Sequence, residues 1–203
     1  MCFYFTQSQS AISLENRFNA RFEFPLRYKP LEIYQAFTFP YAPVITHDQP
    51  DKIQLFQWGL IPSWSKNKDI QKFTLNAQIE TVQSKVSFKN SVNKRCLIPA
   101  ESFWEWQWLD VKGHRKQKYE LFVENKQIFA FAGLWSDWIH VETGELIQTF
   151  TILTMQANEI MSKIHNVKKR MPVILSPDNE RIWLKGGELK TWNEHIIPQK
   201  CNR

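Results

Sequence analysis

A cysteine directly after the initiator methionine carries the most distinctive chemistry in this chain. Removal of Met1 would leave Cys2 with a free α-amine and a thiol on adjacent carbon atoms, a pair that no other residue type offers. An α-amine has a pKa of about 7.7–8.0, so roughly a tenth of it is neutral and nucleophilic at pH 7. Such an amine forms a Schiff base with an aldehyde, and the thiol then closes a five-membered thiazolidine ring. Cys2 therefore points to a carbonyl substrate, although its position alone also fits an incidental terminal cysteine.

Two further side chains could move protons. Glu105 lies between Trp104 and Trp106. In a strand, alternation places both indoles on the opposite face, so the carboxylate could be solvated. In a cleft, aromatic surroundings would raise its pKa toward neutrality and make it a general acid or base. The imidazole of His165 suits proton transfer near neutral pH, although a single histidine is more often a surface or satisfied core residue.

Polar, basic and aromatic residues supply candidates for substrate contact. Asn76 could orient an amine through its side-chain carbonyl oxygen, or it could be a turn residue. The cluster Lys168-Lys169-Arg170 fits phosphate contact as well as a solvated loop. Trp58 is expected in the core, whereas Trp64 follows a Pro-Ser pair and is expected to be exposed.

The composition favours one globular domain over residues 1–203. The net charge of +6 permits a polyanionic partner, and nine Trp and fifteen Phe leave spare aromatic side chains for stacking on unpaired bases. No stretch approaches the ~18–20 apolar residues of a membrane span, and the start lacks the basic segment of a secretory signal. The three widely spaced cysteines form neither a disulfide framework nor a zinc-binding pattern. We therefore expect a cytoplasmic protein without metal or cofactor.

The chain is predicted to fold into many short strands and a few short helices. Expected helices cover residues 10–22, 157–164 and 177–184, the last capped by Ser176-Pro177. Expected strands cover residues 53–60, 129–135, 148–155 and 172–175, with hairpins turning at 124–126 and 143–144. The proline-rich stretch from 25 to 50 should hold loops and short strands. This pattern predicts an α+β fold with a curved, barrel-like, mostly antiparallel sheet flanked by short helices.

Short motifs follow one another in a fixed order along nearly the whole chain. They are Met1-Cys2, Ala42-Pro43, Trp58-Gly59-Leu60-Ile61-Pro62-Ser63-Trp64, Asn76-Ala77-Gln78-Ile79-Glu80-Thr81, Glu105-Trp106, and His165-Asn166 with Arg170-Met171-Pro172. Each motif alone is weak, but the ordered set is specific. It resembles the SOS-response-associated peptidase (SRAP) family of abasic-site-processing proteins.

The resemblance implies a DNA-damage enzyme that cross-links covalently to abasic sites in single-stranded DNA. Carried over by motif, Cys2 would be the nucleophile through both amine and sulfur, and Asn76 would position the amine. Glu105 would shuttle protons during Schiff-base formation and ring closure, and His165 would assist opening of the deoxyribose ring. The resemblance also implies an SRAP-like domain with a basic groove for single-stranded DNA, and nothing requires more than a monomer. The expected DNA contacts are Trp64, Gln78, Lys89, Lys168, Lys169 and Arg170.

The chain departs from the family pattern at positions that concern DNA binding more than chemistry. Phe3 and Tyr4 stand where Gly and Arg are common, and Gln78 replaces the Arg of the Asn-Ala-Arg motif. That change removes one expected phosphate contact. Residues 167–169 are additional, and their lysines would compensate electrostatically for Gln78.

Two other functions stay open on the sequence alone. A cysteine peptidase would use the Cys2 thiolate with His165 as its base, including removal of its own Met1. A lyase or peptidase (hydrolase) activity could also accompany the cross-linking reaction of the abasic-site enzyme. A non-catalytic nucleic-acid-binding module would use Trp64, Lys89, Arg95 and the 168–170 cluster. It would bind with strong salt dependence and give no covalent product.

Overall fold

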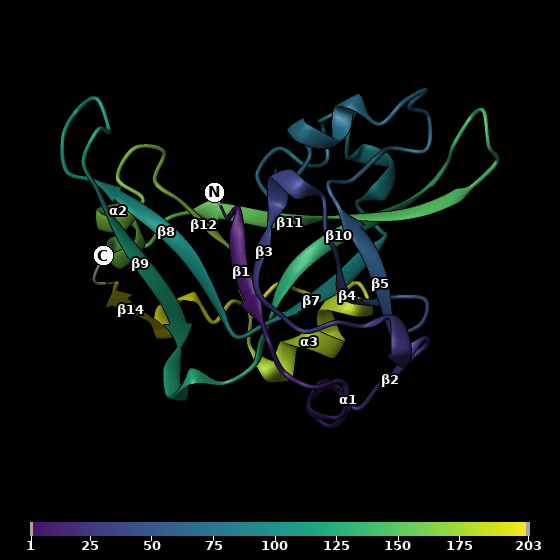
Figure 1. The fold of residues 1–203 in the computed structure, drawn as a ribbon, viewed down its shortest axis with the longest axis horizontal. Coiled ribbons are helices and arrows are strands. Elements are labelled where there is room, and N and C mark those ends of the chain that lie inside the picture. Colours follow the sequence, from purple (N-terminus) through teal and green to yellow (C-terminus); the bar gives the residue numbers. More distant parts are fainter. Residues whose placement is uncertain (1, 202–203) are drawn as a thin grey trace.

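Five strands close into a barrel at the centre of the molecule (Figure 1). They are β4 (Tyr41–Thr46), β5 (Lys52–Trp58), β7 (Arg95–Ala100), β10 (Phe129–Ile139) and β11 (Leu146–Gln156). Neighbouring strands follow the order β11-β10-β7-β4-β5, and a short parallel pairing of β11 with β5 closes the ring. The computed structural model describes residues 2–201.

A second sheet of five strands packs beside the barrel. Its order is β14-β9-β8-β1-β3, with every neighbouring pair antiparallel. The strands are β1 (Tyr4–Gln7), β3 (Leu31–Gln35), β8 (Ser102–Trp108), β9 (Lys116–Val123) and β14 (Ile196–Lys200). Phe5 and Phe103 from its inner face lie 6.0 and 5.9 Å from the Phe131 ring of the barrel, measured between ring centroids. The main hydrophobic core therefore lies between the two sheets.

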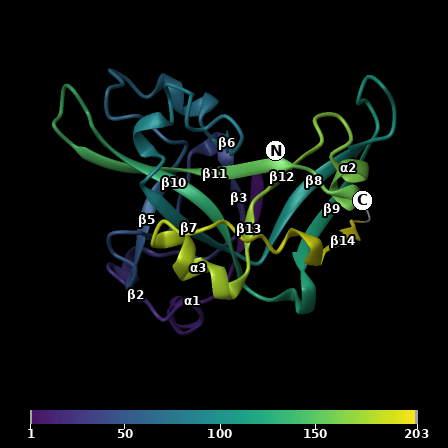
Figure 2. The same ribbon diagram turned by 180° about the vertical axis from the view of Figure 1, so that it is seen from behind.

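Shorter elements complete the fold. The strands β2 (Arg21–Phe22), β6 (Asn76–Gln78), β12 (Arg170–Pro172) and β13 (Ile174–Leu175) extend the barrel. The α-helices are α1 (Ala11–Phe18), α2 (Glu159–Ile164) and α3 (Pro177–Leu184), and single 3₁₀ turns include η3 (Asp69–Phe73), η4 (Lys89–Ser91) and η5 (Glu124–Lys126). The view from behind shows α3 against the barrel and α2 beside β8 (Figure 2). Within residues 2–201, no helix is long and apolar enough to cross a membrane.

The α+β prediction with a barrel-like, mostly antiparallel sheet is confirmed. The hairpin at 143–144 joins β10 to β11, and α3 begins at Pro177 after its N-cap residue Ser176, as predicted. The hairpin predicted at 124–126 is wrong: β9 pairs with β8 and β14, whereas β10 pairs with barrel strands, so η5 links two different sheets.

The helix predicted over 10–22 is too long. It ends at Phe18 because Asn19 adopts the left-handed conformation with φ 48°, and the Ala20 N–H bonds to Glu15 O. The released chain then forms β2, which runs parallel to β5.

Candidate active site

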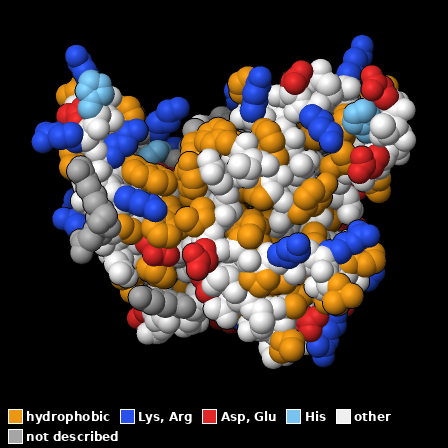
Figure 3. All heavy atoms as spheres, in the orientation of Figure 1, with side chains coloured by type: hydrophobic (Ala, Val, Ile, Leu, Met, Phe, Trp, Pro, Cys, Tyr) orange, Lys and Arg blue, Asp and Glu red, His pale blue; other side chains and the backbone are white. Residues whose placement is uncertain are grey.

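The start of the chain lies against β8. Pairing of Phe5 with Phe103 makes β1 and β8 antiparallel neighbours, so the residues before Tyr4 run toward Glu105 and beyond. Figure 1 places the N-terminus between a lobe formed by β8, β9 and α2 and a lobe formed by the 60–90 segment. The space-filling view shows the surface hollowed between these lobes (Figure 3).

Cys2 is fully buried at this position. Its thiol donates a weak hydrogen bond to Tyr4 O, with an S···O distance of 3.7 Å. Burial, and secondarily the negative charge of Glu105, raise the pKa of the Cys2 thiol. The sulfur is therefore protonated at neutral pH and needs a base before it can act as a nucleophile.

Glu105 lies on the inner face of β8 and is 5% exposed. Alternation turns Trp104 and Trp106 outward, so the solvated alternative for Glu105 is wrong. Burial raises the pKa of the Glu105 carboxyl to about 7. A carboxyl with that pKa can both accept and donate a proton at neutral pH.

Asn76, in β6, is in direct contact with Cys2. Its amide Nδ2 donates a hydrogen bond of 2.9 Å to Cys2 O. Its Oδ1 is buried and has no hydrogen-bond partner within residues 2–201. An unsatisfied buried acceptor costs about 1–3 kcal/mol, so this oxygen is poised for an N–H donor near Cys2.

The Trp-Gly motif holds Asn76 in place. Trp58 is buried, as predicted, and its Nε1 donates 2.8 Å to Leu75 O, one residue before Asn76. Gly59 has φ +102°, and a Cβ there would lie 2.4 Å from Gln71 Cγ. Trp58 and Gly59 therefore fix the backbone next to Asn76.

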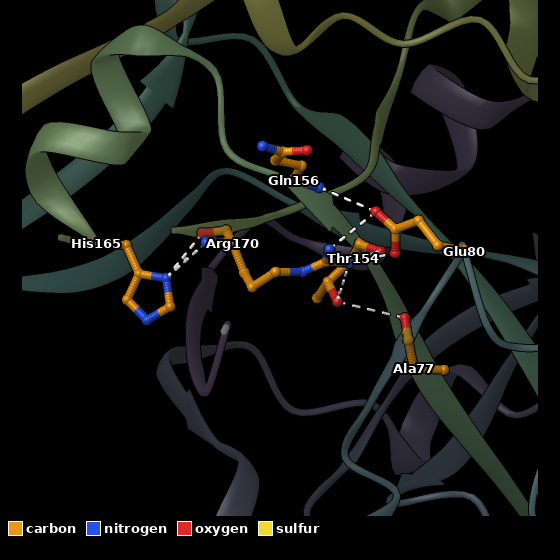
Figure 4. Close-up of polar contacts among 6 residues, drawn as sticks. All are labelled: Ala77, Glu80, Thr154, Gln156, His165 and Arg170. Atoms are coloured by element: carbon orange, nitrogen blue, oxygen red, sulfur yellow. Dashed lines mark hydrogen bonds and ion pairs between the residues drawn. The ribbon is translucent and has the colours of Figure 1, made fainter. Parts of the chain in front are cut away.

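His165 follows α2 and faces the same site. Its Nδ1 lies 2.9 Å from Arg170 O and 3.1 Å from Arg170 N. Figure 4 shows the other ring nitrogen, Nε2, on the side of the ring away from Arg170. Burial lowers the pKa of His165 to about 4, so the imidazole is neutral at pH 7.

Arg170 links the histidine to the Asn76 segment (Figure 4). Its guanidinium donates two hydrogen bonds of 2.8 Å to the two carboxylate oxygens of Glu80. It also donates 2.7 Å to Thr154 O on β11. The side chain of Arg170 is only 14% exposed. This network fixes the distance between β6 and the loop after α2.

A pocket of about 380 Å³ opens beside these groups. It is lined by Phe3, Tyr4, Glu105, Trp106, Trp108, Lys116 and His165. The structure therefore brings Glu105 and His165 to one cavity, with Cys2 and Asn76 joined to each other and Cys2 electrostatically coupled to Glu105. Five lining residues were not among the predicted site residues: Phe3, Tyr4, Trp106, Trp108 and Lys116. The alternation of β8 and β9 was the signal that could have indicated Trp108 and Lys116.

The predicted DNA contacts occupy different positions. Trp64 is 49% exposed, and Gln78, Lys89, Lys168 and Lys169 are also exposed. Arg170 is already engaged by Glu80, which disfavours phosphate contact. The guanidinium of Arg95, a candidate contact in the binding-module alternative, lies 4.2 Å from the Trp183 ring centroid and donates to Trp183 O and Gly187 O. Arg95 therefore anchors the segment around α3.

The fold and site define an α+β barrel protein in which Cys2 lies near Glu105, a buried carboxyl with a raised pKa. The chain belongs to the SOS response associated peptidase (SRAP) family, whose model matches residues 1–201.

Several known proteins are similar to this chain. Abasic site processing protein YoqW of Bacillus subtilis is 41% identical over 142 residues, covering 70% of this chain and 61% of its own length. Abasic site processing protein HMCES of Gallus gallus is 35% identical over 159 residues, covering 66% and 46%. The chain thus spans less than two thirds of the length of these relatives. A solved structure from Bacteroides thetaiotaomicron has a TM-score of 0.90 at 32% identity, covering 99% of this chain and 92% of that one.

Proposed function

We propose that this protein processes abasic sites in single-stranded DNA by forming a covalent thiazolidine cross-link through Cys2 after Met1 is removed. The observation that carries the proposal is the pairing of Asn76 with Cys2 beside Glu105, whose pKa of about 7 suits proton shuttling. The names of the relatives support the substrate. A role in the DNA damage response follows from that substrate.

The reaction requires two bond-forming steps. The Cys2 amine adds to the aldehyde carbon of the ring-opened deoxyribose, and loss of water gives a Schiff base. The Cys2 sulfur then adds to the imine carbon, and the thiol proton ends on the nitrogen. The product is a five-membered ring, and one water molecule is the only leaving group.

Each proposed residue has one role in these reaction steps. Asn76 Oδ1 is the buried acceptor that would hold an amine N–H while Nδ2 fixes Cys2 O. Glu105 would donate a proton to the departing hydroxyl and then accept the thiol proton, which burial otherwise keeps on sulfur. Neutral His165 would take the hydroxyl proton as the deoxyribose ring opens.

The peptidase alternative receives less support. A cysteine peptidase uses a thiolate of lowered pKa next to a protonated histidine. Here burial raises the pKa of the Cys2 thiol and lowers that of His165. Among residues 2–201, the hydrogen bond of the thiol goes to Tyr4 O rather than to His165. Lyase chemistry would need a persistent Schiff base, which closure by the adjacent sulfur removes.

The proposed DNA contacts come from two segments of the chain. Trp64, Gln78 and Lys89 belong to the 60–90 segment, and Lys168 and Lys169 follow α2. We assign phosphate contact to the exposed lysines and stacking to Trp64. The monomeric state and the cytoplasmic location stay predictions.

A denaturing gel tests the proposal directly. Met1-processed protein is incubated with single-stranded DNA that carries one abasic site, and a shifted band is expected without borohydride. Cys2→Ala should give no band, and Cys2→Ser should give one only after borohydride reduction. Cys201→Ala is the matched control, because Cys201 lies just after β14. A borohydride-independent band from Cys2→Ala would sink the proposal.

A further inference from the structure

The outward face of the five-stranded sheet carries a row of tryptophans. Trp104, Trp106 and Trp108 alternate along β8, so their side chains project from one face, opposite the buried Phe103 and Glu105. Each of the three indoles is half-buried. Of the three, Trp106 and Trp108 line the pocket of the candidate active site and Trp104 does not. The row of indoles therefore extends beyond the pocket.

Lysines of the neighbouring strand β9 lie over these rings. Lys118 Nζ is 3.7 Å from the Trp104 ring centroid and 5.8 Å from that of Trp106. Lys116 Nζ is 5.0 Å from the Trp108 centroid. Figure 3 shows hydrophobic side chains interleaved with lysine and arginine on the lobe that contains β8 and β9.

No ion pair of the described residues 2–201 neutralises the positive charge of this face. None of the ion pairs within residues 2–201 involves Lys116 or Lys118. The carboxylate nearest in the register is Glu120, opposite Trp104, and Ser102 Oγ donates a hydrogen bond of 2.6 Å to it. The two ammonium groups therefore remain available to an anionic partner.

We propose that this tryptophan–lysine face, made of Trp104, Trp106, Trp108, Lys116 and Lys118, is a second contact surface for single-stranded nucleic acid. Bases stack on the indoles, and the ammonium groups move from the rings to the phosphates. The surface is continuous with the pocket because Trp106, Trp108 and Lys116 line both. The proposal rests on the proposed function in one respect only, namely that the bound single strand continues from this face into the candidate active site.

The spacing of the indoles favours an extended single strand over a duplex. Alternate residues of a strand lie about 6.6–6.8 Å apart, roughly twice the rise of about 3.4 Å per nucleotide in a stacked duplex strand. Bases must therefore unstack from one another to meet successive indoles. Stacking on an aromatic face is tolerant of sequence, so the face binds any unpaired segment that flanks the reactive site.

Binding of a labelled oligothymidylate without an abasic site separates this surface from the covalent chemistry. Fluorescence anisotropy compares Trp104→Leu/Trp108→Leu with Trp104→Phe/Trp108→Phe. Loss of stacking should weaken the Kd of the leucine variant at least about fivefold, whereas the phenylalanine variant stays close to the parent. Equal melting temperatures of the two variants exclude misfolding as the cause.

A charge-matched pair tests the lysines. Lys116→Ala/Lys118→Ala should reduce the slope of log Kd against log salt by about 0.7 for each phosphate that a lysine no longer neutralises. Lys185→Ala/Lys190→Ala removes the same charge beside α3, away from the β8–β9 turn in Figures 1 and 2, and should leave the slope unchanged.

Three results would overturn the inference. The leucine variant could bind as tightly as the parent, the lysine variant could be indistinguishable from the α3 control, or the parent could bind duplex more tightly than single strand. Each result is independent of the cross-link assay. If the parent protein forms no adduct but still binds the oligothymidylate through the tryptophan–lysine face, the proposed function falls and this surface stands.

Discussion

The side-chain amide of Asn76 donates a hydrogen bond of 2.9 Å to Cys2 O, across 74 residues of chain. The bond ties Cys2, which precedes β1, to β6, and the barrel strand β11 pairs with β6 in parallel register. The same side chain keeps its Oδ1 buried and without a partner among residues 2–201. One amide can thus fix the Cys2 backbone with its nitrogen and receive the amine with its oxygen.

Asn76→Ala tests this double role. Removing both the hydrogen bond to Cys2 O and the acceptor for the amine should slow cross-linking about 10- to 100-fold, which corresponds to roughly 1–3 kcal/mol. The rate is measured under single-turnover conditions with saturating abasic DNA. Asn67→Ala is the matched control, because Asn67 lies in the exposed loop before η3. An Asn76→Ala rate equal to that of the control would contradict the role.

Glu105 predicts a pH dependence of stability with a definite sign. Its pKa is about 7 in the folded protein against 4.5 for the ordinary carboxyl. The cost of ionising the buried carboxyl is therefore absent at pH 4, and it grows as the pH rises from about 4.5 to about 7, toward roughly 3 kcal/mol at most. Glu105→Gln should raise the melting temperature at pH 8 and leave it nearly unchanged at pH 4.

The same variant separates stability from chemistry. Glu105→Gln should lose most of its cross-linking rate at every pH, because the amide cannot shuttle a proton. The parent rate should change most steeply near pH 7. If Glu105→Gln is more stable at pH 8 and still cross-links at the parent rate, Glu105 has no role in proton transfer. Differential scanning calorimetry and the gel assay give the two readouts.

The sequence indicates which residues meet at the candidate site more readily than it indicates which strands pair. Cys2 and Glu105 are recognisable from residue type and from flanking aromatics, and Ser176-Pro177 marks α3 correctly. The wrong hairpin at 124–126 arises because two apolar strands separated by a turn look alike whether they pair with each other or with different sheets. Strand β14 is exposed at every residue except Ile196 and contains Pro198, so its sequence is not typical of a strand and only its pairing with β9 reveals it. Such long-range pairings are not encoded in local periodicity.

Arg95 and Arg170 show the same limit for single residues. Both are basic residues near predicted motifs, so charge alone suggests phosphate contact. The structure places one over Trp183 and the other against Glu80. Whether a guanidinium is engaged inside the protein depends on segments that are distant in sequence.

Breaking the ion pair of Glu80 and Arg170 should disturb His165 as well as stability. Glu80→Ala leaves a largely buried guanidinium with fewer acceptors, which should cost about 1–3 kcal/mol. Because the Arg170 backbone holds His165 Nδ1, the cross-linking rate should also fall. Glu159→Ala breaks the exposed pair with Lys163 and is the matched control, with little expected change. Chemical denaturation measures the stability of both variants, and single-turnover assays measure their cross-linking rates. Equal losses of stability and rate in Glu80→Ala and Glu159→Ala would refute the positioning role of the Glu80–Arg170 ion pair.

Gly59 supplies a test of the segment that positions Asn76. Gly59→Ala must place a Cβ 2.4 Å from Gln71 Cγ and 2.9 Å from Gln71 O, at φ +102°. Gly144→Ala meets the left-handed conformation alone, since φ is +70° and no atom lies within 4 Å of the new Cβ. The Gly144→Ala control should therefore lose about 1–2 kcal/mol of stability, and Gly59→Ala should lose more.

The two variants should also differ in cross-linking rate. Because Trp58 and Leu75 pack beside Gly59, Gly59→Ala should slow cross-linking, whereas Gly144→Ala should not. Equal destabilisation of the two variants in urea would show that the 58–75 segment adapts to the added methyl group, and the positioning role of the motif would then be refuted.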